Sequence, residues 1–491
     1  MPEPALSAFL SGRLDTPRAF YAASKAGNMG EMTGNAAGGF MNITFLLNGE
    51  TVELCEVDPT RSLLSWLREE RGLTGTKEGC NEGDCGACSV LVSNGEGVAA
   101  QNACLLLLGQ LDGRAITTVE GLSGPKGVLH PVQQALVDHH GSQCGFCTPG
   151  IAVTLAGAHL QGATDFDTRL AGNLCRCTGY APIVRAAQSA AEMAVPEWFA
   201  PQKRPQGDGA QPTSVDALAN EIMRRPHATL IAGNTDVGLW LNKDLRKLSD
   251  VIFLGDVADL KRHVVDAEGI HIGAGVSIEA LRELLDAHHP HFAAMLARFA
   301  SAQIRAAATI GGNIANASPI GDTPPALIAL DARLYLRRGE ARRVVALEDF
   351  FIAYGRQDRQ AGEFIEGLTI PRQEDNLRVY KNSKRFDQDI SAVLGAFNIA
   401  IKDGIVQSAR IAFGGMAATP KRARAVEAAL LGQPWSRQSI AAAQGVFERD
   451  FTPIDDLRAS AAYRLDVARA MLERAWLEDQ GVSTNVREVA P

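Results

Sequence analysis

The sequence predicts a multidomain α+β protein, and three observations support this fold class. Residues 41–57 have the pattern of a β-hairpin and precede a helix and a glycine-rich loop that contains three cysteines. Residues 121–195 carry helical patterns and four more cysteines. After a proline-rich stretch, strands and helices alternate toward the end of the chain. The chain has 491 residues and is 46% hydrophobic, so three or four domains of roughly 100–200 residues are expected.

Residues 41–120 are predicted to form a β-grasp, ferredoxin-like module. The dipeptide Asn48-Gly49 is a strong signal for a two-residue hairpin turn. The expected elements are strands at 41–47, 51–57, 89–93 and 116–119 and a helix at 60–71. Residues 1–40 have weak patterning and are expected to be a flexible extension, unless Met41 is the native start.

Four cysteines of this module form a candidate metal site: Cys80, Cys85, Cys88 and Cys104. The first three follow the pattern C-x4-C-x2-C, which is the spacing of plant-type [2Fe-2S] ferredoxins. The loop glycines Gly79, Gly83 and Gly86 are expected to adopt positive φ, so that backbone N–H groups point at the cluster. A structural zinc site is the alternative, but zinc sites usually combine two short cysteine pairs. The pattern therefore favours an electron-transfer cluster.

Residues 121–195 are predicted to form four short helices, at 131–139, 149–160, 165–171 and 182–193. Their cysteines come in two close pairs, which are Cys144 with Cys147 and Cys175 with Cys177. A second [2Fe-2S] cluster is the economical interpretation, although zinc fits two pairs as well. A redox-active dithiol is a further alternative, and the presence of the second pair argues against it. Cys55 is left over in a predicted strand and is expected to be a buried structural cysteine.

The remainder of the chain contains two candidate phosphate-binding turns. Residues 196–212 include four prolines and are predicted to be a linker. Gly/Asn/Thr turns at 230–236 and 309–313 then follow apolar stretches, and their backbone N–H groups suit phosphate oxygens. Neither turn matches a known nucleotide fingerprint, so each is weak alone. The predicted elements here are helices at 214–224, 277–287, 291–299 and 455–477, with strands at 228–232, 251–254 and 270–273.

Charge and cysteine usage exclude several classes of protein. The net charge is −8 and no dense Lys/Arg run occurs, so we expect no nucleic-acid partner. No run of about 18 apolar residues occurs, so we expect no membrane span. Eight cysteines lie between Cys80 and Cys177, which favours thiolate clusters in a reducing, cytoplasmic setting. The charged run at 381–390 and the histidines at 139–140 and 289–291 are expected to be solvated or at helix ends.

From Met41 onward the chain resembles the iron–sulfur/FAD small subunits of bacterial xanthine dehydrogenases, in the molybdenum hydroxylase family. Three cysteine motifs carry the resemblance, and the segment Thr309–Asp322 carries it in the flavin region. The resemblance implies an FAD-binding α+β domain of the vanillyl-alcohol oxidase type with a C-terminal α+β subdomain. The implied divisions are a ferredoxin-like 2Fe-2S domain at 41–120, a helical 2Fe-2S domain at 121–195, a linker at 196–212, the FAD domain at 213–376 and the subdomain at 377–491.

The resemblance also implies which residues contact FAD. These are Leu230, Ile231, Ala232, Gly233, Asn234, Thr235, Asp236, Val237, Phe299, Thr309, Ile310, Gly311, Gly312, Asn313, Asp322, Ile365 and Lys381. Ile365 stands where relatives can have leucine, and Gly321 where they often have serine. All eight cysteines that would hold the two clusters are present.

The activity implied by the resemblance is electron transfer for a xanthine dehydrogenase. A molybdopterin-binding large subunit would oxidise hypoxanthine or xanthine, in a heterodimer or a dimer of heterodimers, and no catalytic residue is expected in this chain. Electrons would pass through the helical-domain cluster, the ferredoxin-like cluster and FAD to NAD+. The alternatives are the same subunit of an aldehyde, carbon monoxide or aromatic hydroxylase, or a non-catalytic electron-transfer protein.

Overall fold

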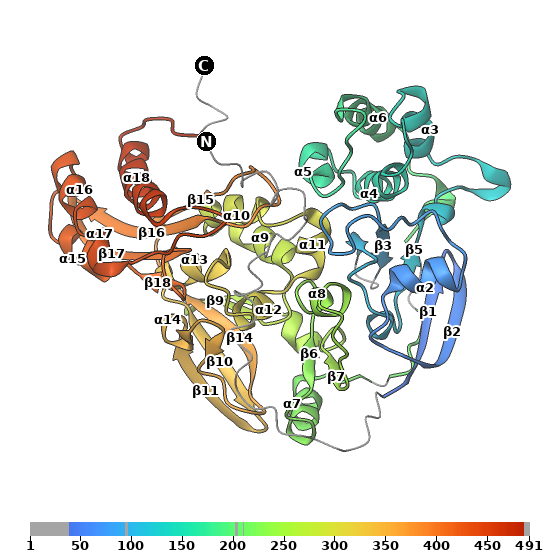
Figure 1. Ribbon diagram of the computed structural model, residues 1–491, viewed down its shortest axis with the longest axis horizontal. Helices are drawn as coiled ribbons and strands as arrows, with labels where there is room; N and C mark the ends of the chain where they lie inside the picture. The colour runs from blue at the N-terminus through green and yellow to red at the C-terminus, as the bar shows by residue number, and fades with distance from the viewer. Residues whose placement is uncertain (1–38, 94–96, 202–204, 210, 486–491) are drawn as a thin grey trace, which may run out of the picture. The chain divides into compact units, whose positions relative to one another are not determined.

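The computed structural model describes residues 39–93, 97–201, 205–209 and 211–485. Within these residues the chain forms a five-stranded mixed sheet, a group of helices, a five-stranded antiparallel sheet and a four-stranded antiparallel sheet, in that order (Figure 1). This confirms the multidomain α+β class. The expected extension at 1–40 lies outside the described residues except for Gly39 and Phe40.

The first sheet has the strand order β2-β1-β5-β3-β4, in which β1 and β5 are parallel and the other neighbours antiparallel. The predicted hairpin turn forms with positive φ at Asn48 and Gly49. Helix α2 begins later than predicted, because Ser62 caps it by accepting from the Ser65 backbone N–H. Strand β4 was missed. The elements are β1 (Met41–Leu47), β2 (Glu50–Val57), α2 (Leu63–Glu69), β3 (Ser89–Ser93), β4 (Val98–Asn102) and β5 (Ala115–Thr117), with a 3₁₀ turn η1 (Leu108–Gln110).

The four predicted helices of the next region are present, each within two residues of the expected bounds at either end. They are α3 (Pro131–Asp138), α4 (Thr148–Leu160), α5 (Phe166–Leu170) and α6 (Ala181–Ala191), accompanied by 3₁₀ turns η2 (Val119–Gly121), η3 (Pro125–Gly127) and η4 (Glu197–Phe199). Helix α4 is apolar on nearly all sides because it packs against β3 of the first sheet and against the other helices. Gly157 allows this close approach, since an added Cβ would lie 2.7 Å from a Leu91 methyl carbon.

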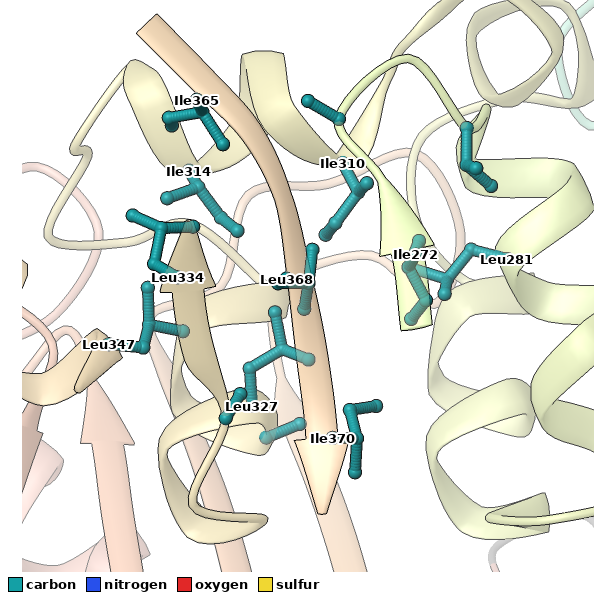
Figure 2. Packing of buried hydrophobic residues seen from close by; sticks show 14 of the residues in the cluster. Ile272, Leu281, Ile310, Ile314, Leu327, Leu334, Leu347, Ile365, Leu368 and Ile370 are labelled. Carbon is teal, nitrogen blue, oxygen red and sulfur yellow. The ribbon is translucent and has the colours of Figure 1, made fainter. Parts of the chain in front are cut away.

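The second five-stranded sheet, β11-β10-β14-β9-β8, organises the largest hydrophobic core. Figure 2 shows Leu368 and Ile370 of the central strand packed among Ile272, Leu334 and the two isoleucines of α12. The elements are α7 (Val215–Arg224), β6 (Thr229–Ile231), α8 (Val237–Asn242), β7 (Val251–Phe253), η5 (Ala258–Lys261), β8 (His263–Val265), β9 (Gly269–Gly273), α9 (Ile278–Asp286), α10 (Pro290–Ala297), α11 (Ala302–Ala307), α12 (Ile310–Ala315), α13 (Thr323–Ala329), β10 (Arg333–Arg338), β11 (Ala341–Ala346), α14 (Leu347–Phe350), β12 (Phe351–Ala353), β13 (Arg356–Gln357) and β14 (Phe364–Pro371).

The last sheet, β15-β16-β17-β18, is buried on both faces. Leu394, Ala396 and Ala412 face the preceding core with α13, whereas Phe397 and Phe413 join a core made with the C-terminal helices (Figure 1). The elements are β15 (Leu377–Asn382), β16 (Val393–Lys402), β17 (Ile405–Gly414), β18 (Lys421–Arg422), α15 (Arg424–Leu430), α16 (Arg437–Gln444), α17 (Phe447–Asp450) and α18 (Ala461–Asp479). No helix in the described part of the chain has the length and apolarity that crossing a membrane requires.

Two expectations about burial were wrong. Cys55 is exposed, because Val52 and Leu54 of β2 face the core and the alternation of a strand turns Cys55 to the other face. His289 lies at a helix end as expected, at the N-terminus of α10, but it is buried rather than exposed, because the Asp375 carboxylate lies 2.9 Å from its Nδ1 and satisfies the ring.

Candidate functional site

The first cysteine set is brought together as two pairs of thiols. Cys80 and Cys85 form two reciprocal hydrogen bonds, in which the backbone N–H of each residue donates to the other's sulfur at 3.4 Å. Cys88 and Cys104 are buried, with their sulfurs 3.4 Å apart. Cys104 follows strand β4, so that strand carries the fourth thiol back to the loop. Cys88 directly precedes β3 and Cys104 follows β4, so this pair lies at one end of the first sheet.

Two of the three loop glycines have the backbone geometry that the sequence predicted. Gly83 has a φ of 88° and Gly86 a φ of 65°. Gly79 does not lie in the left-handed region, so that expectation was wrong. Gly79 instead allows the backbone to pack closely against the Cys85 sulfur, because an added Cβ would lie 2.8 Å from that sulfur. Gly86 combines both needs, since a Cβ there would lie 2.1 Å from the Gly172 carbonyl oxygen.

Within each pair, the pKa of one thiol is lowered and the pKa of the other is raised. The hydrogen bond with Cys85 lowers the pKa of Cys80 to about 5, and the same bond raises the pKa of Cys85. The bond between Cys88 and Cys104 likewise lowers the pKa of Cys88 and raises that of Cys104. In each pair the pKa of one thiol is thus lowered, which favours the thiolate form that binds iron.

The second cysteine set lies between helix ends. Cys147 is the N-cap of α4, and Cys175 and Cys177 lie in the turn between α5 and α6. Cys144 lies near Cys177 and Cys147 near Cys175, close enough for the thiols of each pair to shift one another's pKa. Burial raises the pKa of Cys147 to about 12, with the bond to Cys175 adding to the shift. Tyr180 orders this turn, because its hydroxyl accepts from the Cys175 N–H at 2.8 Å and donates to the Asn173 carbonyl at 3.0 Å.

The paired arrangement of both sets suits binuclear iron better than zinc. A structural zinc ion takes four ligands around one point. In a [2Fe-2S] cluster with four cysteines, two thiolates serve each iron. The thiol pairs provide such a donor set twice, so the residues fit two clusters.

A hydrogen-bonded contact joins the two cysteine sets. The Leu174 N–H donates to the Cys85 carbonyl at 2.9 Å. One residue earlier, the Asn173 side-chain amide donates to the Gly86 carbonyl at 2.9 Å. The loop before Cys175 is therefore fixed directly onto the loop of the first set.

The two predicted turns of the flavin region lie against each other. The first turn connects β6 to α8, and an added Cβ at Gly233 would lie 1.8 Å from the Ala307 carbonyl oxygen, two residues before the second turn. Asn316, just after α12, donates to the Asp236 carboxylate at 3.3 Å. Burial raises the pKa of Asp236. The second turn is the start of helix α12 rather than a simple turn, with Thr309 as its N-cap.

Asp322 and Lys381 form a buried ion pair beside these turns. Their charged atoms are 2.5 Å apart, and Ser391 donates to the other carboxylate oxygen at 2.6 Å. Lys381 is therefore an exception to the solvated run expected at 381–390. Phe299 is held through its carbonyl, which accepts from the buried Arg305 at 3.0 Å. Ile365 is buried in strand β14.

These residues fit a flavin nucleotide by their chemistry. The backbone at Gly233 and Gly311 packs so closely against neighbouring chain that a side chain has no room. The Oδ1 of Asn234 is buried without a hydrogen-bond partner, although its Nδ2 donates to the Leu105 carbonyl at 2.7 Å. A buried acceptor of this kind needs a donor. The expected contacts from Leu230 to Val237 and from Thr309 to Asn313 are thus neighbours in space, and their contact with FAD stays a prediction.

Several residues that organise the site were missed at the sequence level. Asn173, Asn242, Lys243 and Gln303 each bridge segments that lie far apart along the chain. Asn173 lies two residues before Cys175 in the second cysteine motif, and this position is the one sequence signal that could have indicated its role. The others have no local pattern, because their partners are backbone carbonyls or amides of distant segments.

Four family profiles match consecutive parts of the chain. They are described as a 2Fe-2S iron–sulfur cluster binding domain at residues 45–111, a [2Fe-2S] binding domain at 118–188, an FAD binding domain in molybdopterin dehydrogenase at 207–373 and a CO dehydrogenase flavoprotein C-terminal domain at 378–479. The order of these matches is that of the two cysteine sets and the flavin region.

Curated relatives are xanthine dehydrogenases. The chain is 32% identical to the enzyme of Emericella nidulans over 83% of its own length, and 30% identical to xanthine dehydrogenase 1 of Arabidopsis thaliana over 80%. It spans 36% of the length of each of these relatives.

Solved structures share the fold. Carbon monoxide dehydrogenase from Oligotropha carboxidovorans superposes with a TM-score of 0.51 at 26% identity, over 54% of this chain and 94% of that chain. Quinoline 2-oxidoreductase from Pseudomonas putida 86 superposes with a TM-score of 0.52 at 24% identity, over 55% of this chain and 96% of that chain.

With two thiol sets and a flavin region in this order, the chain belongs to the molybdenum hydroxylase family, as its 2Fe-2S and FAD electron-transfer module.

Proposed function

We propose that this chain is the electron-transfer subunit of a cytoplasmic xanthine dehydrogenase. When bound, the two 2Fe-2S clusters and FAD would carry electrons singly from a partner subunit's molybdenum centre, where hypoxanthine or xanthine is oxidised, and deliver them as hydride to NAD+. The residues of this chain would hold these groups, fix their spacing and keep water away from them. The domain divisions predicted from the sequence are part of this proposal.

The observation that carries the proposal is the position of the first cysteine set between the other two sites. On one side, the Leu174 N–H donates to the Cys85 carbonyl. On the other side, Lys243, directly after α8, donates to the Cys80 carbonyl at 2.6 Å. Helix α8 also follows the first flavin turn. These direct contacts on both sides favour an electron path with the first set in the middle, although the flavin region also contacts the second set's loop, through the bond from Gln303 to Asn173.

The exposure of the cysteines supports the direction of that path. Cys144 and Cys177 are exposed, whereas Cys88 and Cys104 are buried. Phe146 and Leu174, which are about half exposed, neighbour the exposed set in sequence. A molybdopterin-binding partner that covered this surface would shield the second set from water. It would also meet the second set first, because the first set is buried.

A second candidate is the same module of a molybdenum hydroxylase with another substrate. It is favoured by the superposition with carbon monoxide dehydrogenase and by the match to a CO dehydrogenase flavoprotein domain. Xanthine dehydrogenase remains the first choice because the relatives that match most of this chain carry that name.

The test has two steps. The purified chain should contain about four irons and one FAD, and on reduction it should give two distinct [2Fe-2S] EPR signals. Zinc in place of iron in the second set would contradict the two-cluster path. The chain is then combined with a candidate molybdopterin-binding subunit from the same source and assayed for NAD+ reduction with xanthine, aldehydes and quinoline. Turnover with xanthine supports the proposal, and turnover confined to another substrate supports the second candidate.

A further inference from the structure

We propose that Lys243 is a positioning residue that sets the redox balance of the first cluster; this inference rests on the proposed electron-transfer function. Its Nζ donates to the Cys80 carbonyl at 2.6 Å and lies 3.2 Å from the Glu82 carboxylate. Lys243 thus brings a positive charge from the flavin region into the loop that presents three of the four thiols.

The neighbouring residue completes a two-point clamp on the thiol set. Asn242 donates its side-chain amide to the Cys104 carbonyl at 2.8 Å. Cys80 and Cys104 belong to different thiol pairs, so the end of α8 holds one residue from each half of the set. Asn234, in the flavin turn before α8, adds a bond to the Leu105 carbonyl at 2.7 Å. The segment from Asn234 to Lys243 therefore links the flavin turn rigidly to both halves of the first site.

Charge distinguishes Lys243 from the neutral members of this clamp. Four thiolates and two sulfides around two ferric irons have a net charge of −2, and reduction by one electron makes the cluster more negative. A nearby cation stabilises the reduced form more than the oxidised form, and a nearby anion does the reverse. Glu82 is the anion that opposes Lys243. Asp84 and Arg385 also exert charge effects at this loop, and both are unchanged in the variants below.

Partial exposure limits the size of the effect. The Lys243 side chain is 41% exposed and that of Glu82 36% exposed, so water and salt screen both charges. We therefore expect a change of about threefold to tenfold in the ratio of reduced to oxidised cluster at a fixed redox poise. Tenfold corresponds to about 59 mV for a one-electron couple. The change should shrink as ionic strength rises.

The experiment is a redox titration of the full chain with its clusters and flavin bound, followed by EPR. At the poise where the first cluster is half reduced in the unaltered protein, Lys243→Gln should lower its reduced-to-oxidised ratio and Glu82→Gln should raise it. Lys243→Arg keeps the charge and should stay close to the unaltered ratio. Lys247→Gln removes an exposed lysine four residues after Lys243 and serves as the matched control. The second cluster is an internal reference, because Lys243 contacts none of its four cysteines in the described structure.

A purely structural role would give a different result. If Lys243 only held the loop, both charge-removing variants would broaden the signal or move the ratio in the same direction. The inference is overturned by that result, by an unchanged ratio in Lys243→Gln, or by equal shifts of both clusters. Absence of both [2Fe-2S] signals from the unaltered protein would instead overturn the proposed function, and this inference with it.

Discussion

The Nε2 of Gln303 lies 2.8 Å from the Oδ1 of Asn173, and this hydrogen bond joins helix α11 of the flavin region to the loop that carries Cys175 and Cys177. The same nitrogen lies 3.2 Å from the Oγ1 of Thr154 in α4. All three side chains are buried. Asn173 in turn bonds the Gly86 carbonyl in the first cysteine loop. Two buried amides, those of Gln303 and Asn173, therefore tie together the three regions that would have to be held at fixed distances for electron transfer.

Replacing Gln303 by leucine should destabilise the protein, because two buried acceptors would lose their donor. The expected loss is about 1–3 kcal/mol, which should appear as a lower midpoint of thermal unfolding in calorimetry. The matched control is Gln407→Leu on strand β17, where the glutamine is exposed and its side chain makes a long 3.5 Å hydrogen bond to the Ile405 carbonyl. Equal midpoints for the two variants would show that the Asn173 contact does not stabilise the assembly of these regions.

Cys177→Ser should remove the second cluster and leave the first. Serine cannot supply the thiolate that pairs with Cys144, so the iron content should fall from about four to about two per chain and one EPR signal should disappear. Reduction of a dye by NADH through the flavin should persist, whereas electron flow from a molybdenum partner should stop. Cys55→Ser is the control, because Cys55 is exposed and lies in strand β2 apart from both sets. Survival of both activities in Cys177→Ser would contradict the electron path.

Gly233→Ala should reduce flavin binding. The added Cβ would lie 1.8 Å from the Ala307 carbonyl oxygen, so the first flavin turn has to move away from the second. We expect a large loss of bound FAD, measured from the absorbance of flavin released per chain. Gly97→Ala is the control, since an added Cβ there meets nothing within 4 Å. Full retention of FAD in Gly233→Ala would mean that this turn does not bind the cofactor.

Glu279→Gln should destabilise the protein in a pH-dependent manner. Burial opposes ionisation of Glu279, but Arg305 and Arg282 outweigh it and lower the pKa of the carboxyl below its ordinary value of 4.5. Because the folded-state pKa is lowered, the stabilisation is present above pH 4.5 and is lost as the pH falls through the folded-state pKa. Arg305, which holds the Phe299 carbonyl, would lose this charged partner.

The measurement compares midpoints of thermal unfolding for the two proteins across pH. Near neutral pH the variant should be less stable by about 1–3 kcal/mol. As the pH falls from 4.5 through the lower folded-state pKa, the difference should shrink toward zero, because the Glu279 carboxyl of the folded unaltered protein then becomes protonated. A difference independent of pH would show that shape, rather than charge, accounts for the effect.

The chemistry of the thiol sites was determined by the sequence. Spacing alone placed Cys80, Cys85 and Cys88 on one loop, because residues so close along a chain must also be close in space. The dipeptide Asn48-Gly49 specified its turn for the same local reason. Helices such as α3 and α6 followed from prolines near their starts and from apolar periodicity, both of which act over a few residues.

Contacts between distant segments were decided by the tertiary structure. The Lys243–Cys80 bond spans 163 residues, the Asn173–Gln303 bond 130 and the Lys381–Asp322 pair 59. The charged run at 381–390 predicted a solvated face, yet Lys381 is buried because the Asp322 carboxylate pairs with its charge, and Ser391 donates to the other oxygen of that carboxylate. The exposure of His289 and of Cys55 was predicted wrongly for a similar reason, since burial depends on what packs against a residue. Local spacing determines which groups can bind a metal or a phosphate, and only long-range packing decides which of them are charged, covered and joined to one another.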